Sequence, residues 1–89
     1  MTFFKHKNHK YLISFSIIEN DKQTNYSRVV ILYNKITSEE SLYQLEGCIR
    51  DNFYNKGIIK ELNSFLNSKC TINTFSYLGK TEEAVTKFL

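Results

Sequence analysis

Two runs of alternating apolar residues, separated by a polar segment, constrain the fold of this chain more than any other feature. In the first run one parity carries the larger apolar side chains: Tyr11, Ile13, Phe15 and Ile17. In the second run Val29, Ile31 and Tyr33 share one parity and alternate with Arg28 and its neighbours. A period of two is typical of strands with one buried face. The polar residues 19–25 between the runs predict an antiparallel hairpin with a long loop.

The residues after the hairpin have helical spacing. A capping box, in which the Thr37 hydroxyl accepts a hydrogen bond from the Glu40 amide, predicts a helix start. Gly57 supplies a left-handed stop. Between these signals the apolar residues recur on one side of a helix: Leu42, Leu45, Ile49 and Phe53. A helix is therefore expected from Ser38 to about Asn55.

Three further elements are expected in the second half. The spacing over 58–66 predicts a helix, β-branched and aromatic residues over 71–78 favour a strand, and 81–89 is expected to form a short helix. The order β-β-α-α-β-α indicates an α+β fold: a two-layer sandwich with a mostly antiparallel sheet, made of the hairpin and one further strand, and helices on one face. Phe75 is assigned to the core. Eight residues are expected to be buried together: Ile13, Phe15, Val29, Ile31, Leu45, Ile49, Leu62 and Phe65.

Size and composition fit one domain over residues 1–89, with residues 1–10 as a basic N-terminal arm. Proline is absent and glycine occurs three times, so no linker divides the chain. The two cysteines, Cys48 and Cys70, are expected to be reduced and to behave as small apolar residues, with a disulfide left open. No signal-peptide pattern or membrane-length apolar run is present, which predicts a cytoplasmic protein.

Catalytic and metal chemistry find little support in the sequence. His6 and His9 could lie on one side of a helical turn, but no third ligand is identifiable, so no metal or other cofactor is expected. The acidic pairs at 39–40 and 82–83 are explained by helix starts. No nucleophile lies in a recognisable catalytic arrangement. The chain is therefore expected not to be an enzyme.

A binding surface is expected on the sheet face that points away from the helices. If Val29 and Ile31 lie under the helices, the other parity of the second strand faces outward, together with two serines of the first strand. The expected partner-binding residues are Tyr26, Arg28, Val30, Leu32, Ser14 and Ser16. A nucleic-acid binder is the alternative, and it would gather basic residues on one sheet face: Lys5, Lys7, Lys10, Arg28 and Lys35. A structural homo-oligomer, paired through the hairpin edge or the outer face, is a third possibility.

The amino-acid composition of the chain also resembles that of a known group of small proteins. Usage rich in asparagine, lysine and isoleucine, with little arginine and no proline, resembles coding by an AT-rich genome. In size, composition and element order the whole chain resembles small accessory proteins of phages and plasmids from low-GC Gram-positive bacteria. It is similar in style to anti-CRISPR and other anti-defence inhibitors. The resemblance implies stoichiometric occlusion of a host nuclease, or of its nucleic-acid site. It includes no motif, so it assigns no functional residue.

Overall fold

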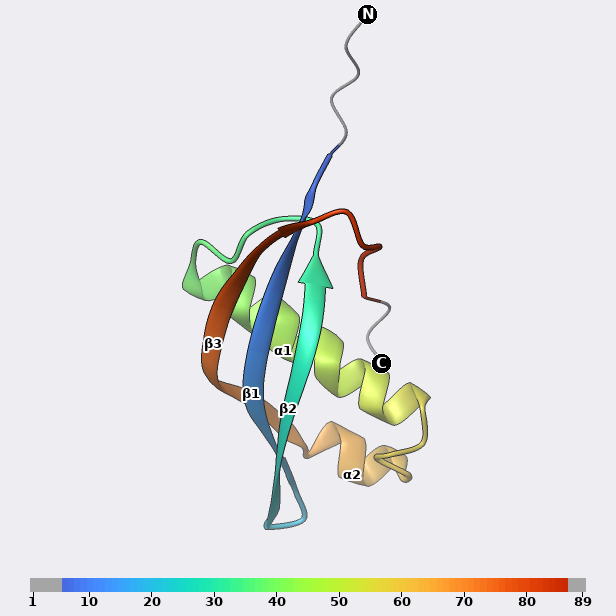
Figure 1. The fold of residues 1–89 in the computed structure, drawn as a ribbon. Helices are drawn as coiled ribbons and strands as arrows, with labels where there is room; N and C mark the ends of the chain where they lie inside the picture. The colour runs from blue at the N-terminus through green and yellow to red at the C-terminus, as the bar shows by residue number, and fades with distance from the viewer. Residues whose placement is uncertain (1–5, 87–89) are drawn as a thin grey trace, which may run out of the picture.

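The computed structural model describes residues 6–86 of the 89-residue chain. The fold is α+β, with elements in the order β-β-α-α-β (Figure 1). The elements are β1 (Asn8–Glu19), β2 (Lys22–Leu32), α1 (Glu39–Asn55), α2 (Leu62–Leu66) and β3 (Lys69–Thr81). The strands form one antiparallel sheet of three strands in the order β2-β1-β3. Residues 8–10 of the expected N-terminal arm therefore belong to the central strand.

The hairpin between β1 and β2 closes with two residues, not with the long loop expected over 19–25. Asn20 and Asp21 have φ values of 51° and 62°, and Glu19 pairs directly with Lys22. Both turn residues lie in the left-handed region, which asparagine and aspartate enter more easily than other non-glycine residues. Because the turn is so short, β2 begins at Lys22 and its pairing register is fixed.

This register corrects the expected faces of β2. Cross-strand partners lie on the same face of a sheet, and the turn pairs odd-numbered residues of β1 with even-numbered residues of β2. The pairs on the helix side include Tyr11 with Val30, Ile13 with Arg28, and Phe15 with Tyr26. Val30 is accordingly 3% exposed, whereas Val29 is 50% exposed. The expectation that Val29, Ile31 and Tyr33 lie under the helices is wrong.

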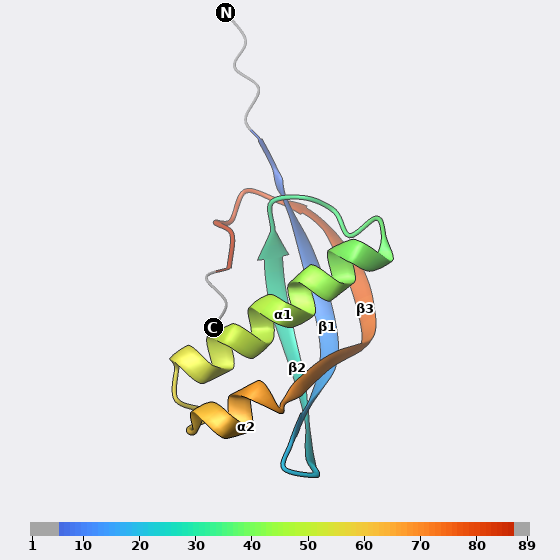
Figure 2. The ribbon, with the colours of Figure 1, turned by 180° about the vertical axis from the view of Figure 1, so that it is seen from behind.

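Helix α1 supplies most of the helical part of the core. It lies behind the sheet in Figure 1 and in front of it in Figure 2. Its inward residues pack with the odd-numbered residues of β1. The buried core consists of Tyr11, Ile13, Phe15, Ile17, Val30, Leu45, Ile49, Phe53, Ile59 and Cys70. Of the eight expected core residues, Val29 and Leu62 are instead exposed, and Ile31 and Phe65 are half-buried.

The predicted helix after the hairpin is confirmed, with a shift of one residue at its start. The N-cap is Ser38, not Thr37, and the Ser38 hydroxyl accepts a hydrogen bond from the Ser41 amide at 3.2 Å. At the other end Gly57 has a φ of 75°, as the expected left-handed stop requires. Both ends of α1 are therefore set by local capping residues, and the sequence predicted each of them to within one residue.

The second helix is shorter than its apolar spacing indicates. The backbone amides of Ile58 and Ile59 both donate to the Phe53 carbonyl, at 2.9 and 3.1 Å, so they close the end of α1 instead of starting a new helix. Helix α2 begins only at Leu62. As a result Ile59 enters the core and Leu62 faces solvent.

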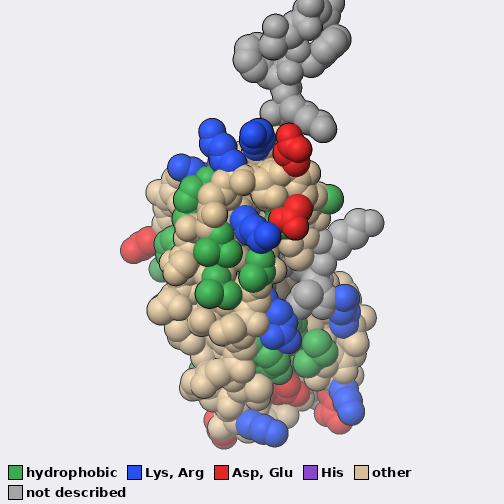
Figure 3. Space-filling view, viewed as in Figure 1, with side chains coloured by type: hydrophobic (Ala, Val, Ile, Leu, Met, Phe, Trp, Pro, Cys, Tyr) green, Lys and Arg blue, Asp and Glu red, His purple; other side chains and the backbone are tan. Residues whose placement is uncertain are grey.

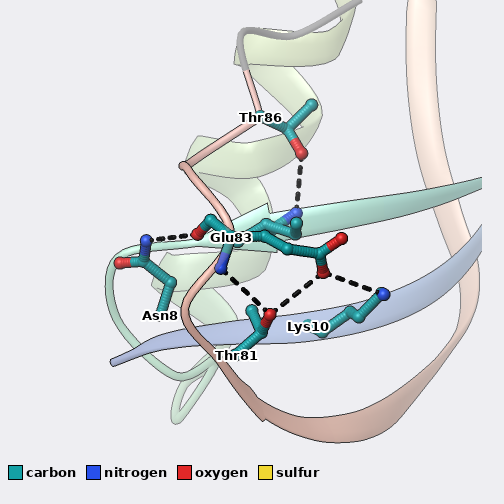
Figure 4. A network of polar contacts seen from close by, with 6 residues as sticks. Asn8, Lys10, Thr81, Glu83 and Thr86 are labelled. Carbon is teal, nitrogen blue, oxygen red and sulfur yellow. Dashed lines mark hydrogen bonds and ion pairs between the residues drawn. The ribbon is translucent and has the colours of Figure 1, made fainter. Parts of the chain in front are cut away.

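The C-terminal helix expected from Thr81 is wrong over the described residues. Thr81 ends β3, and residues 82–86 cross the sheet towards β2 without helical structure (Figures 1 and 4). The Glu83 amide donates to the Thr81 hydroxyl at 3.1 Å, and such side-chain acceptors compete with helix formation. Phe88 and Leu89 of the expected helix lie outside the described residues. No helix in residues 6–86 has the length and apolarity needed to cross a membrane.

Candidate interaction surfaces

The second half of β3 is exposed on both faces of the sheet. All residues from Asn73 to Leu78 are exposed, and we call this segment the β3 surface. It includes large apolar side chains: Phe75 is 43% exposed, Tyr77 41% and Leu78 52%. Helix α1 meets β3 further back, where a Glu46 carboxylate oxygen accepts the Ile72 amide at 2.7 Å. A strand normally buries one face, so this segment is incompletely covered.

The outer edge of β3 has no neighbouring strand among residues 6–86, because the sheet order is β2-β1-β3. Between Lys69 and Lys80 the strand carries no charged residue. Edge strands of natural proteins are usually blocked by charges, prolines or a covering segment, since an open edge pairs readily with other chains. The β3 edge has neither charge nor proline along this stretch, and two register shifts against β1 are the one protecting feature it carries beyond Ile72 in the described residues.

The edge of β2, in contrast, is paired at Ile31 with the chain's own C-terminal segment (Figure 4). The Thr86 amide donates to the Ile31 carbonyl at 2.9 Å, and the Ile31 amide donates to the Thr86 hydroxyl at 2.8 Å. Glu83 holds this segment in place, because its carboxylate accepts from Lys10 Nζ at 2.9 Å and from the Thr81 hydroxyl at 3.0 Å. The two edges of the sheet are therefore treated differently.

The two aromatic rings of the β3 surface, Phe75 and Tyr77, lie against the ring of the buried Tyr11. The Tyr11 ring lies 5.1 Å from the Tyr77 ring and 6.1 Å from the Phe75 ring, centroid to centroid. The Tyr11 hydroxyl in turn accepts the Ile36 amide at 2.9 Å. Rings held in this way offer a large contact area at a low cost in side-chain entropy, which is typical of protein–protein interfaces.

The outer face of the sheet carries a closed network of hydroxyl and amide groups. The Ser16 hydroxyl donates to Asn25 Oδ1 at 2.7 Å and accepts from Asn73 Nδ2 at 2.8 Å and from Gln23 Nε2 at 3.3 Å. Ser16 is buried as a result. Ser14 is hydrogen-bonded to Ser27 at 3.1 Å. Of the two serines expected to contact a partner, Ser16 is therefore already enclosed by its neighbours.

The other expected partner-binding residues lie on the helix side of β2 and not on the outer face. Val30 is buried, and Leu32 packs against the core. The Tyr26 ring packs 5.0 Å from the Phe53 ring. The Arg28 guanidinium lies 5.4 Å above the Tyr26 ring. The structure does not bring the six expected residues together on one exposed face, because the register places the even-numbered residues of β2 under the helices.

The basic residues expected to form one sheet face are also separated. Lys10 points to the outer face and pairs with Glu83, whereas Arg28 lies on the helix side. Lys5 lies outside the described residues. Lys7 and Lys35 are exposed near the end of the sheet where β1 begins, and Figure 3 shows lysine side chains gathered there.

Two histidines and a lysine of β3 lie at the same end, and of these the sequence had not indicated Lys80. His9 Nδ1 and the Tyr77 hydroxyl are hydrogen-bonded at 2.9 Å, and Lys35 Nζ lies 4.7 Å from the Tyr77 ring centroid. Lys80 pairs directly with His9 across the sheet. Loss of hydration and the positive charges of Lys35, Lys80 and His6 lower the pKa of His9 below its ordinary value. We call the group of Lys7, Lys35, Lys80, His6 and His9 the basic end.

The two cysteines are free and lie in different environments. Cys48 is exposed on α1, and Cys70 is buried in the core. Burial and, secondarily, the nearby Glu46 carboxylate raise the pKa of the Cys70 thiol to about 12. Among residues 6–86 no three histidine, cysteine, aspartate or glutamate side chains lie close enough together to hold a metal ion.

A hollow of about 500 Å³ lies between the hairpin tip and the end of α1. Its walls include Glu19 and Lys22 from the hairpin and Phe53, Ile58 and Ile59 from the helical side. The lining mixes one carboxylate and one ammonium group with uncharged polar, aromatic and aliphatic side chains. It resembles an ordinary surface depression more than a ligand pocket with converging polar groups.

A scan against protein-family models, a search of curated proteins and a search of solved structures each found no match. The β3 surface was missed in the sequence because Phe75 was assigned to the core. The uncharged stretch over 70–79, bounded by Lys69 and Lys80, was the available signal of an unprotected edge.

Proposed function

We propose that this two-layer α+β chain is a small non-enzymatic binding protein that acts by stoichiometric contact with another protein. The observation that supports the proposal most strongly is the β3 surface. It combines an open strand edge, exposure on both faces and braced aromatic rings within one short segment. A partner that adds to this edge would satisfy backbone groups that now face water, and its side chains would cover Phe75 and Leu78.

The difference between the two sheet edges favours a partner on β3. Thr86 pairs with β2 at Ile31, and β2 also carries the charges of Lys22 and Arg28, whereas the outer edge of β3 beyond Ile72 has neither a pairing segment nor a charge before Lys80. An edge left open at random would be an aggregation hazard. A partner in the working state removes that hazard, which gives a physical reason for the asymmetry.

The resemblance to phage and plasmid accessory proteins suggests the kind of partner. We place the chain in the cytoplasm of a low-GC Gram-positive cell, where it occludes a defence nuclease or a related host or phage protein. An inhibitor that works by occlusion needs a rigid contact surface and no catalytic group. The β3 surface is of that kind.

Site-directed photo-crosslinking tests the proposal. Phe75 is replaced by p-benzoylphenylalanine, and the protein is irradiated in a lysate of a low-GC Gram-positive bacterium. The matched control carries the same group at Tyr43, an exposed tyrosine on α1. We expect one adduct at position 75 and none at position 43. Wild-type protein should compete for the adduct, and a Phe75→Ser, Leu78→Ser variant should not.

The captured protein, once purified, is titrated with the wild-type chain. Stoichiometric binding with a sharp end point supports the proposal. An adduct with the mass of two copies of the chain would replace it with homo-oligomerisation through β3. Equal adducts at positions 43 and 75, or none at either, would show that β3 is not the contact surface.

A further inference from the structure

The basic end contains two histidine–tyrosine pairs of different geometry. The His6 ring stacks on the Tyr33 ring with centroids 3.8 Å apart and planes 13° apart. His6 Nε2 also donates to the Tyr33 carbonyl at 2.9 Å. In the second pair, His9 Nδ1 is hydrogen-bonded to the Tyr77 hydroxyl. The first pair shows that the exposed Tyr33 ring presents a face on which a flat aromatic group lies.

The lysines around these pairs are not neutralised by the described part of the chain. The ion pair formed within residues 6–86 joins Lys10 to Glu83, and it involves neither Lys35 nor Lys80. Both of these lysines act on His9, because their charges contribute to its lowered pKa. Two cations from different segments, the loop after β2 and the end of β3, thus lie beside Tyr77 and His9. The carboxylates of Glu82 and Glu83 lie at the same end, but the lysines at positions 7, 10, 35 and 80 outnumber them, so the local potential is positive.

We infer that the basic end binds single-stranded nucleic acid, with Lys35 and Lys80 on backbone phosphates and the Tyr33 ring stacked against a base. A phosphate between the two ammonium groups would relieve their mutual repulsion. A base on Tyr33 would extend the aromatic stack that His6 already begins. Cationic grooves interleaved with exposed aromatic rings are the usual means of binding single strands without sequence preference.

The geometry favours a single strand over a duplex. Bases of a duplex are stacked on one another and cannot reach the Tyr33 ring, whereas unpaired bases can. The basic end also lacks arginine, since Arg28 pairs with Ile13 in the middle of β1 and Arg50 lies on α1. Arginine forks are the common means of reading bases in duplex DNA. This site adjoins the β3 surface at Tyr77, which contacts His9 and Lys35, but it does not include Phe75 or Leu78. The two proposals are tested with different variants, so either can fail alone.

Fluorescence anisotropy with labelled oligo-dT and oligo-U of about 15 nucleotides tests the inference, beginning at about 50 mM salt. The test variant is Lys35→Gln, Lys80→Gln. The matched control is Lys56→Gln, Lys60→Gln, which removes the same charge from exposed lysines between α1 and α2. Loss of two phosphate contacts should weaken binding roughly 20-fold at about 0.1 M salt and lower the log–log salt slope by about 1.4. The control should bind as the wild type does.

Tyr33→Ala separates stacking from charge, because it should weaken binding while leaving the salt slope unchanged. Thermal melting checks that each variant folds. No binding to either oligonucleotide at low salt overturns the inference, as does equal weakening by the two double variants. Equal affinity for a duplex of the same length would reject single-strand preference. Equal affinity for a polyglutamate peptide would show that the basic end binds acidic protein segments instead.

Discussion

Ile13 and Phe75 are direct cross-strand partners in the β1–β3 pairing, yet Ile13 is 0% exposed and Phe75 is 43% exposed. The two side chains lie on the same face of the sheet, one strand apart. Helix α1 crosses β3 and is hydrogen-bonded to it at Ile72 (Figure 2), yet Phe75 three residues further on is exposed, so the boundary of the core runs between Ile13 and Phe75. That boundary separates a well-packed interior from the surface that we propose as the contact site.

The core side of this boundary should be sensitive to truncation. Phe15 packs against the rings of Tyr26 and Phe53, at 5.4 and 5.8 Å between centroids. Phe15→Ala should therefore lower the free energy of unfolding by about 3–5 kcal/mol, as measured by urea denaturation. Val29→Ala, on the outer face, should cost less than about 1 kcal/mol. Similar losses at both positions would mean that the sheet faces are assigned wrongly.

The two-residue turn makes a prediction at Asp21, where φ is 62°. A β-branched residue is strained in this region, so Asp21→Val should destabilise the protein by about 1–2 kcal/mol. Lys22→Val is the control, because position 22 is strand and accepts valine well. Asp21→Gly should be tolerated, since glycine enters positive φ freely. If Asp21→Val proved no worse than Lys22→Val in the same denaturation experiment, the left-handed turn would be in doubt.

The length of this turn also explains why the buried face of β1 could be predicted from the sequence and that of β2 could not. Alternation identified both hairpin strands and the buried parity of β1, because there the apolar residues lie mainly on one side. In β2 the two parities are almost equally apolar, so alternation could not choose between Val29 and Val30. The choice depends on the number of turn residues. A two-residue turn at Asn20 and Asp21 would have placed Val30 opposite Tyr11 and hence in the core.

The remaining errors arose where tertiary contacts override local pattern. Residues 81–86 have a helix-like start, but Glu83 and Thr86 instead form hydrogen bonds with β1 and β2. Those contacts join segments more than fifty residues apart in the chain, which no local rule can indicate. The nucleic-acid alternative included Lys7 and Lys35 but missed Lys80 for the same reason, because Lys80 comes to lie opposite His9 only when β3 pairs with β1.

The cysteines should differ sharply in reactivity. With its pKa raised to about 12, the Cys70 thiol has almost no thiolate at neutral to mildly alkaline pH, and it is also buried. Cys48 is exposed on α1. Iodoacetamide should therefore label the native Cys70→Ser variant readily and the native Cys48→Ser variant very slowly, as followed by mass spectrometry. Both should be labelled in denaturant. Rapid labelling of native Cys48→Ser would show that the core around Cys70 opens.

The Glu83 carboxylate should make stability depend on pH in a defined direction. Hydrogen bonds from Lys10 and Thr81, followed by the charge of Lys10, lower the pKa of Glu83 below its ordinary value. A carboxyl whose pKa is lower in the folded state stabilises the fold above its unfolded pKa, and this contribution is lost as the pH falls through the folded pKa. Glu83→Gln should therefore be less stable than wild type at neutral pH, and the difference should shrink towards zero in acid.

Denaturation of wild type and Glu83→Gln across this pH range measures the effect, with the exposed neighbour variant Glu82→Gln as the control. Glu82→Gln should remain close to wild type, because no hydrogen bond or ion pair to Glu82 is formed within residues 6–86. Hydrogen exchange at the Ile31 and Thr86 amides should quicken in Glu83→Gln, since loss of the Lys10 contact loosens the segment that covers the β2 edge. An effect of Glu83→Gln that is independent of pH, or one matched by Glu82→Gln, would show that the ion pair with Lys10 does not hold this segment.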